Sequence, residues 1–258
     1  MNLLLLDSSE LSPDNSTTLY GRRAEHICQI LNAQVGNSLS AGIINGEYGN
    51  AEITHINTEK TEVSLLFTPN QNKPHQLSPA SLSIIVIIAL PRPKIAKRLI
   101  AVCAECGVKE LHFINSFRVE KSFWQSPELN AENIHQQLML GLEQSKDTAL
   151  PVVNLHSKFK PFVEDKLATI RGNRDCFVAH PYNADLTLNN LNDPSTIGAF
   201  GHVVIIGPEG GFIPYEVALL KENGCQILAI GSRIYRVETV VPMLLALLGN
   251  RAISQHLK

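Results

Sequence analysis

The chain has 258 residues, of which 44% are hydrophobic and 18% are charged, and its formal net charge is −2. This composition is typical of a folded globular protein, and it excludes a disordered chain and a polycation that binds nucleic acid mainly through phosphates. The apolar run 82–90 is too short for a membrane span, and the N-terminus lacks the basic region of a signal peptide. The five cysteines are scattered, which argues against a disulfide framework, so we expect a cytoplasmic protein.

The first 75 residues have the pattern of a small β domain, interrupted by one helix at 22–31. Short apolar runs that alternate with polar residues indicate strands at 34–40, 42–44, 51–56 and 62–67. Several short strands in so few residues predict a small barrel. The proline-rich segment 69–80 is the expected linker, and a chain of this length favours two domains. The predicted domains are therefore 1–75 and 76–258.

After the linker the pattern changes to alternating strands and helices. Runs rich in Ile and Val indicate buried strands, expected at 82–90, 110–115, 176–180, 202–206 and 226–230. Helical patterns, some opened by proline, are expected at 93–106, 130–146, 158–168, 214–222 and from 240 to the end. This alternation predicts an α/β domain with a mostly parallel sheet covered on both faces. The last helix is apolar on nearly every side and must be buried in a core or against a partner.

The strongest functional motif is Gly207-Pro208-Glu209-Gly210-Gly211, between an apolar strand and a helix. Ligands of open α/β sheets bind at the carboxyl ends of strands, and glycines there let the backbone approach a ligand closely. A tight strand-to-helix turn is the structural alternative, but three glycines with a proline and an acid favour ligand binding. The motif matches neither glycine-rich phosphate-binding pattern, so nucleotide phosphates are not the expected ligand.

A second motif, 230–239, also follows an apolar strand and precedes a helix. Its two arginines either serve a ligand or pair with Glu238 and helix carbonyls, and both alternatives stay open. Thr239 is expected to cap the last helix, with Pro242 in its first turn. His180, at a third strand end, is either a base or a structural residue.

Two weaker patterns are ambiguous. Cys103-Ala-Glu-Cys106 lacks a second ligand pair for zinc, and we expect two buried residues on one helix face. The basic segment 91–98 is either an RNA-binding patch or the solvated start of a helix.

Together these motifs resemble the ribosomal RNA small subunit methyltransferase E family of the SPOUT superfamily. The segments 207–211 and 228–239 are similar to the two S-adenosylmethionine loops of that family. Shorter matches lie at 26–31, 104–108, 116–121 and 142–145. The resemblance implies a PUA-like β-barrel, followed by a SPOUT-type α/β domain with a deep trefoil knot. It also implies a homodimer with the active site at its interface.

The implied activity is S-adenosylmethionine-dependent methylation of N3 of a decoding-region uridine in 16S rRNA, within the small ribosomal subunit and without a metal. Arg236 would stabilise negative charge on the uracil, and Glu238 would orient Arg236 or accept the proton, while Arg233 would support the loop. RNA contacts are expected from Arg22, Arg23, His26, Arg92, Lys94 and Arg118. Cofactor contacts are expected from His180, Pro181, Ile206, Gly207, Pro208, Glu209, Gly210, Gly211, Ile230, Gly231, Ser232, Ile234, Tyr235 and Thr239.

The chain departs from the family pattern at Asn32, at 146–148, and at Tyr235 and Val237 in the last loop. The cofactor loops are thus better preserved than the presumed RNA-contacting positions. Two alternatives follow: the same fold and cofactor acting on a different RNA, or a non-catalytic protein that binds RNA or assists ribosome assembly.

Overall fold

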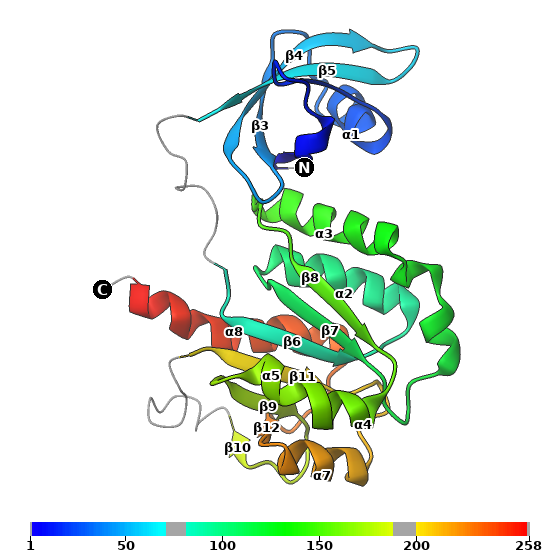
Figure 1. Ribbon diagram of the computed structural model, residues 1–258, viewed down its shortest axis with the longest axis vertical. Coiled ribbons are helices and arrows are strands. Elements are labelled where there is room, and N and C mark those ends of the chain that lie inside the picture. The colour runs from blue at the N-terminus through cyan, green and yellow to red at the C-terminus, as the bar shows by residue number, and fades with distance from the viewer. Residues whose placement is uncertain (1, 71–80, 188–199, 257–258) are drawn as a thin grey trace. The chain divides into compact units, whose positions relative to one another are not determined.

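The computed structural model describes residues 2–70, 81–187 and 200–256. The chain forms two compact units (Figure 1), one of Met1–Pro79 with Met139–Leu150 and the other of Ala80–Leu138 with Pro151–Lys258. Most of the expected linker, 71–80, lies outside the described residues, as does the expected boundary between 75 and 76.

The first unit is built on a five-stranded sheet in the order β1-β3-β4-β5-β2. Only the β1–β3 pair is parallel. The strands are β1 (Leu4–Leu6), β2 (Ser16–Leu19), β3 (Ser38–Ile43), β4 (Tyr48–Asn57) and β5 (Glu62–Pro69). Their buried side chains pack on helix α1 (Gly21–Glu25) and on the π-helical turn that continues it over His26–Ile30. This curled sheet around one helix fits the barrel-like domain predicted from the sequence.

Two details of the first unit differ from the sequence prediction. The expected strands 34–40 and 42–44 form one strand, β3, which passes through Gly42 without interruption. A Cβ atom at Gly42 would lie 2.6 Å from the Thr148 side chain, so this glycine allows close packing and does not break the strand. The edge strands β1 and β2 escaped prediction because runs of three or four residues show little alternation.

The second unit contains a seven-stranded, fully parallel sheet in the order β10-β12-β9-β11-β6-β7-β8. The strands are β6 (Ile84–Ala89), β7 (Glu110–Ile114), β8 (Val152–His156), β9 (Asp175–Ala179), β10 (Leu186–Thr187), β11 (His202–Ile206) and β12 (Gln226–Ala229). Every residue of the central strands β6 and β11 is buried, as expected for strands covered on both faces. This confirms the predicted α/β class with a parallel sheet.

Helices flank this sheet, and Figure 1 shows α5 in front of it and α8 behind it. The helices are α2 (Pro93–Glu105), α3 (Ala131–Ser145), α4 (Phe159–Pro161), α5 (Leu167–Arg171), α7 (Pro214–Glu222) and α8 (Val237–His256), and a π-helical turn at Phe162–Lys166 joins α4 to α5. Helix α3 begins in the second unit and ends in the first. The edge strands β8 and β10 were not predicted, since β8 is only partly buried and β10 has two residues.

The start of α8 corrects another prediction. The helix begins at Val237, and the carbonyl oxygen of Arg236 accepts hydrogen bonds from the backbone amides of Thr239 and Val240, both at 3.0 Å. Thr239 therefore lies inside the helix and does not cap it. Pro242 lies beyond the first turn, where it cannot donate to the carbonyl of Glu238.

All five cysteines are free thiols, and Cys103 is buried in α2 with Cys106 half-buried at its end. Burial raises the pKa of the Cys103 thiol above its usual range. Within 2–70, 81–187 and 200–256, no helix is long and apolar enough to cross a bilayer. No group of His, Cys, Asp and Glu side chains in those ranges could hold a metal ion.

Candidate functional site

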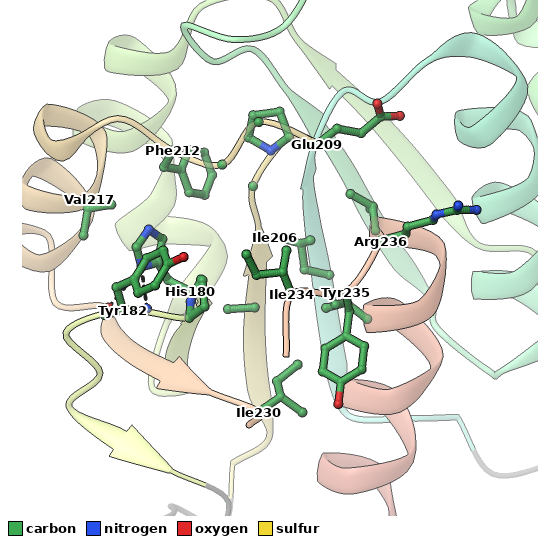
Figure 2. Close-up of a pocket in the computed structure, with 18 of the residues that line it drawn as sticks. His180, Tyr182, Ile206, Glu209, Phe212, Val217, Ile230, Ile234, Tyr235 and Arg236 are labelled. Carbon is green, nitrogen blue, oxygen red and sulfur yellow. Dashed lines mark hydrogen bonds between the residues drawn. The ribbon is translucent and has the colours of Figure 1, made fainter. Parts of the chain in front are cut away.

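Three loops at the carboxyl edge of the seven-stranded sheet line a pocket of about 1450 Å³. The loops are 179–183 after β9, 206–212 after β11 and 230–236 after β12. In the sheet register Ala179 lies opposite both Ile206 and Leu228, so the three strands end side by side. The structure therefore brings the two glycine-bearing motifs together at one site, with the His180 loop beside them (Figure 2).

Apolar side chains form much of the pocket lining. They come from strands β11 and β12, from the loops that follow them, from α7 and from the start of α8: Ile206, Phe212, Val217, Leu228, Ile230, Ile234 and Val240. Figure 2 shows Ile206 and Ile234 near the middle of the pocket, Ile230 below them and Phe212 near α7. A site of this kind holds the apolar part of a small ligand, while the exposed backbone of the loops supplies polar contacts.

The glycines of the two motifs have different roles. A Cβ atom at Gly207 would lie 3.1 Å from the Phe212 ring, so a side chain at this position would have to displace that ring slightly. Gly211 has a φ of +75°, a conformation that side chains other than glycine rarely adopt. At Gly231 an added Cβ would meet no atom within 4 Å. Gly231 is thus the glycine of these loops at which a side chain would enter open space.

Basic residues from two other strand ends line the same pocket. Arg92 and Lys94 follow β6, and Arg118 follows β7. The Arg92 guanidinium lies 3.4 Å from the Glu209 carboxylate, and Arg118 donates a hydrogen bond to the carbonyl of Gly210. The pocket therefore combines an apolar interior with cationic side chains beside the glycine loop, an arrangement suited to a small ligand next to an anionic polymer.

His180 lines the pocket at the end of β9. Its Nδ1 atom lies 3.0 Å from the Tyr182 carbonyl and 3.3 Å from the Tyr182 amide nitrogen, and the two rings meet edge to face. Because Nδ1 is engaged with the backbone, a role for His180 as a base would fall to Nε2.

The structure places nearly all of the predicted cofactor residues on the pocket wall. Ser232 and Thr239 do not line it, and both are exposed. The sequence prediction missed Phe212, Val217 and Tyr182, because apolar and aromatic residues in these positions carry no motif. Arg233, expected only to support its loop, also lines the pocket.

Arg236 and Glu238 both line the pocket at the start of α8. In the part of the chain that the structure describes, the Arg236 and Glu238 side chains form no hydrogen bond or ion pair with each other. Figure 2 shows the Arg236 side chain directed away from Ile206 and Ile234. Arg236 is exposed, so its guanidinium is accessible to a ligand or substrate.

The predicted RNA-binding residues of the first unit are engaged in contacts within that unit. Both terminal nitrogens of Arg22 donate to the Glu143 carboxylate, at 2.9 and 2.7 Å. Arg23 donates to the Glu10 carboxylate and to the carbonyl of Leu5. These partners lie far from Arg22 and Arg23 in the chain and leave no local pattern in the sequence. His26 is half-buried on the same face, and the RNA contacts of all three residues stay predictions.

Two of the departures from the family pattern have structural explanations. Asn32 has a φ of +48°, a left-handed conformation that asparagine tolerates better than most residues. The segment 146–148 packs within the first unit, where the Lys146 carbonyl accepts a hydrogen bond from the Tyr48 hydroxyl at 3.1 Å. The amide of Thr148 donates to the same hydroxyl at 3.2 Å.

Comparison with known protein families matches residues 78–249 to the RNA methyltransferase domain. Ribosomal RNA small subunit methyltransferase E of Treponema pallidum is 27% identical over 242 residues, covering 93% of this chain and 87% of that protein. Ribosomal RNA small subunit methyltransferase E 1 of Borreliella burgdorferi is 26% identical over 239 residues, covering 93% of each chain.

Solved structures share the fold over almost the whole chain. One is a ribosomal RNA small subunit methyltransferase E from Neisseria gonorrhoeae bound to S-adenosyl methionine, with a TM-score of 0.72, 19% identity and 95% of each chain covered. Another is a probable rRNA-methyltransferase from Porphyromonas gingivalis, with a TM-score of 0.70, 21% identity and 100% of each chain covered. At these identities the likeness concerns the fold.

Proposed function

Because the chain belongs to the RNA methyltransferase domain family, we propose that it transfers a methyl group from S-adenosylmethionine to N3 of a uridine in 16S rRNA. The resemblance to ribosomal RNA small subunit methyltransferase E, seen first in the motifs, is confirmed by the whole-chain matches. Within this proposal the target is the decoding-region uridine 1498. The observation on which the proposal rests is that two glycine-bearing loops meet Arg92, Lys94 and Arg118 at one pocket.

The pocket residues suit S-adenosylmethionine. Ile206, Leu228 and Val240 offer apolar surface for an adenine ring, and the backbone of the glycine loops offers donors and acceptors for the ribose and the amino acid part. Gly231 leaves open the space that a Cβ atom would fill. When bound, the cofactor supplies a methyl group activated by a positively charged sulfur.

The residues at the start of α8 would act on the uracil. Uracil N3 carries a proton at neutral pH, and this proton must leave as the new N–C bond forms. Arg236 would stabilise the negative charge that develops on the uracil carbonyls, and Glu238 would accept the proton or orient Arg236. Buried apolar neighbours such as Ile206 and Val240 would exclude water and strengthen these electrostatic effects.

The finer architecture is part of the same proposal. It comprises the trefoil knot in the second unit, RNA contacts from the PUA-like first unit, and a homodimer. Exposed apolar side chains at Ile234 and Leu247, with 76% and 39% of their surfaces accessible, support a partner surface near α8. Light scattering that gives a mass near 28.4 kDa at working concentration would contradict the dimer.

Two measurements separate this function from its alternatives. Calorimetry with S-adenosylmethionine distinguishes an enzyme from a non-catalytic RNA-binding or assembly protein, which would show no binding. Mass spectrometry of 16S rRNA from a deletion strain distinguishes the proposed target from another RNA. We expect cofactor binding by the wild type and loss of one 3-methyluridine in the deletion strain.

A further inference from the structure

Phe117 is an exposed aromatic residue on a fixed backbone. It follows β7, between the buried Ser116 and the pocket-lining Arg118, and 76% of its surface is accessible. Singly exposed hydrophobic residues are common on protein surfaces, so the exposure of this ring has meaning only together with the way its segment is held. The contacts of this segment show a backbone that is fixed beside the pocket.

The backbone of Phe117 is held by a buried carboxylate. Its amide donates a hydrogen bond to Oε1 of Glu216 at 2.7 Å, and Glu216 is only 2% exposed. The other carboxylate oxygen of Glu216 accepts a hydrogen bond from the amide of Ile213 at 3.0 Å. One buried side chain therefore links the Phe117 segment to the end of the glycine loop and the start of α7.

The next residue strengthens this link. The Arg118 guanidinium donates to the carbonyl of Gly210, and a Cβ atom at Gly210 would lie 2.9 Å from Cδ of Arg118. The segment is thus held by α7 through the Phe117 amide and by the glycine loop through Arg118. Because this backbone is already fixed, little backbone entropy is lost when the ring binds a partner.

The charges around Phe117 indicate the kind of partner. Arg118, the residue after Phe117, lines the pocket together with Arg92 and Lys94, whereas Phe117 lies just outside its lining and has chain neighbours that add no exposed apolar surface. An exposed aromatic ring next to a cationic side chain is typical of sites that bind single-stranded nucleic acid, where bases stack on the ring and phosphates meet the cation. A protein partner would be expected to cover a broader apolar patch.

We propose that Phe117 stacks on a nucleobase of the RNA substrate beside the pocket, and so sets the affinity and position of the RNA without contributing to cofactor binding. This inference rests on the proposed function, since it assigns a substrate contact at the same site. It adds a specificity-determining residue that the glycine and arginine motifs do not contain.

The test measures binding of a fluorescein-labelled oligouridylate and of an abasic oligomer of equal length, which has the phosphates without the bases. The wild type should bind the oligouridylate more tightly. Phe117→Ala should weaken that binding by about 5- to 150-fold and leave the abasic oligomer unaffected, whereas Phe117→Trp should retain it. The control is Phe200→Ala, because Phe200 is 69% exposed but precedes β11, at the opposite edge of the sheet.

The result that overturns the proposal is equal oligouridylate binding by wild type and Phe117→Ala. A changed oligomeric state of Phe117→Ala in light scattering would also overturn it and assign the ring to a second copy of the chain. In turnover assays on small ribosomal subunits, Phe117→Ala should raise KM for the subunit with calorimetric cofactor affinity unchanged. If the wild type binds no S-adenosylmethionine, the proposed function fails, and the oligomer comparison still tests Phe117 separately.

Discussion

Arg22 and Glu143, 121 positions apart in the chain, form a bidentate ion pair inside the first unit, with N–O distances of 2.9 and 2.7 Å. The Glu143 side chain is 3% exposed, whereas that of Arg22 is 50% exposed. The backbone carbonyl of Glu143 also accepts hydrogen bonds from the amides of Asn2 and Leu3. Arg22 therefore balances the negative charge of a buried carboxylate at the point where the end of α3 contacts the N-terminal segment.

Arg22→Ala should destabilise the protein by about 2 kcal/mol. Breaking a buried pair typically costs about 3–5 kcal/mol, and the half-exposed position of Arg22 lowers this figure. Urea unfolding followed by circular dichroism measures the loss. Lys160→Ala is the control, because Lys160 and Glu164 form an exposed pair at 3.6 Å that should contribute less than about 0.5 kcal/mol. Equal losses in the two variants would show that the buried carboxylate needs no partner.

Substitution of Gly231 should reduce cofactor binding without unfolding the protein. A Cβ atom at this position enters open pocket space, so the side chain of Gly231→Val would compete only with a ligand. We expect calorimetric affinity for S-adenosylmethionine to fall at least about tenfold, a loss of ~1.4 kcal/mol, with the melting temperature nearly unchanged.

Gly211→Val is a poorer test of the same pocket, because it places a β-branched residue at a φ of +75° and strains the loop itself. It should lower the melting temperature as well as the affinity. A Gly231→Val protein that binds the cofactor like the wild type would move the cofactor site away from the loop at 230–236.

The parallel sheet and the position of its ligand edge could be predicted from the sequence, because buried strands and glycine-rich strand ends are local signals. Strand β11 and helix α7 were predicted with their observed bounds. The start of α8 was not, because a proline suggested the first turn of a helix that in fact begins at Val237. Contacts between distant segments, such as that of Glu216 with Phe117, leave no pattern in the sequence and required the structure.

Acid should destabilise the second unit through a pair of histidines. Nδ1 of His112 lies 3.0 Å from Nε2 of His156, and Nε2 of His112 lies 2.8 Å from the Glu110 carboxylate. Burial lowers the pKa of His156 to about 4, with further contributions from His112 and Lys166. Burial also lowers the pKa of His112, against the opposing effect of Glu110.

Because the folded protein favours the neutral histidines, the unfolded chain binds more protons below its ordinary histidine pKa of 6.5. The contribution of the two neutral histidines to the free energy of unfolding should be complete above that pH and should decrease as the pH falls toward 4. Urea midpoints measured across this window should show the decline, and His156→Phe should flatten it. The same slope in His156→Phe and wild type would exclude this pair as the cause.

Arg236→Ala should lower methyl transfer by about 100-fold or more while the cofactor still binds, since removing a group that stabilises transition-state charge typically has an effect of this size. Glu238→Gln should have a smaller effect. If the carboxylate is the base, the rate of the wild type should fall at low pH and that of Glu238→Gln should not follow it. Single-turnover rates on small ribosomal subunits measure both, with Lys160→Ala as the control. A near-normal rate for Arg236→Ala would show that Arg236 does not stabilise the transition state. The rate acceleration would then have to come from the proximity and orientation of the two substrates.

Methyl transfer to N3 of a uridine can be measured by incubating the purified protein with S-adenosylmethionine that carries a tritiated methyl group and with small ribosomal subunits from the deletion strain. We predict that label enters 16S rRNA and is recovered after nuclease digestion as 3-methyluridine, and that Gly231→Val and Arg236→Ala reduce its incorporation. Absence of label in 16S rRNA, or label on a base other than uridine, would contradict the account.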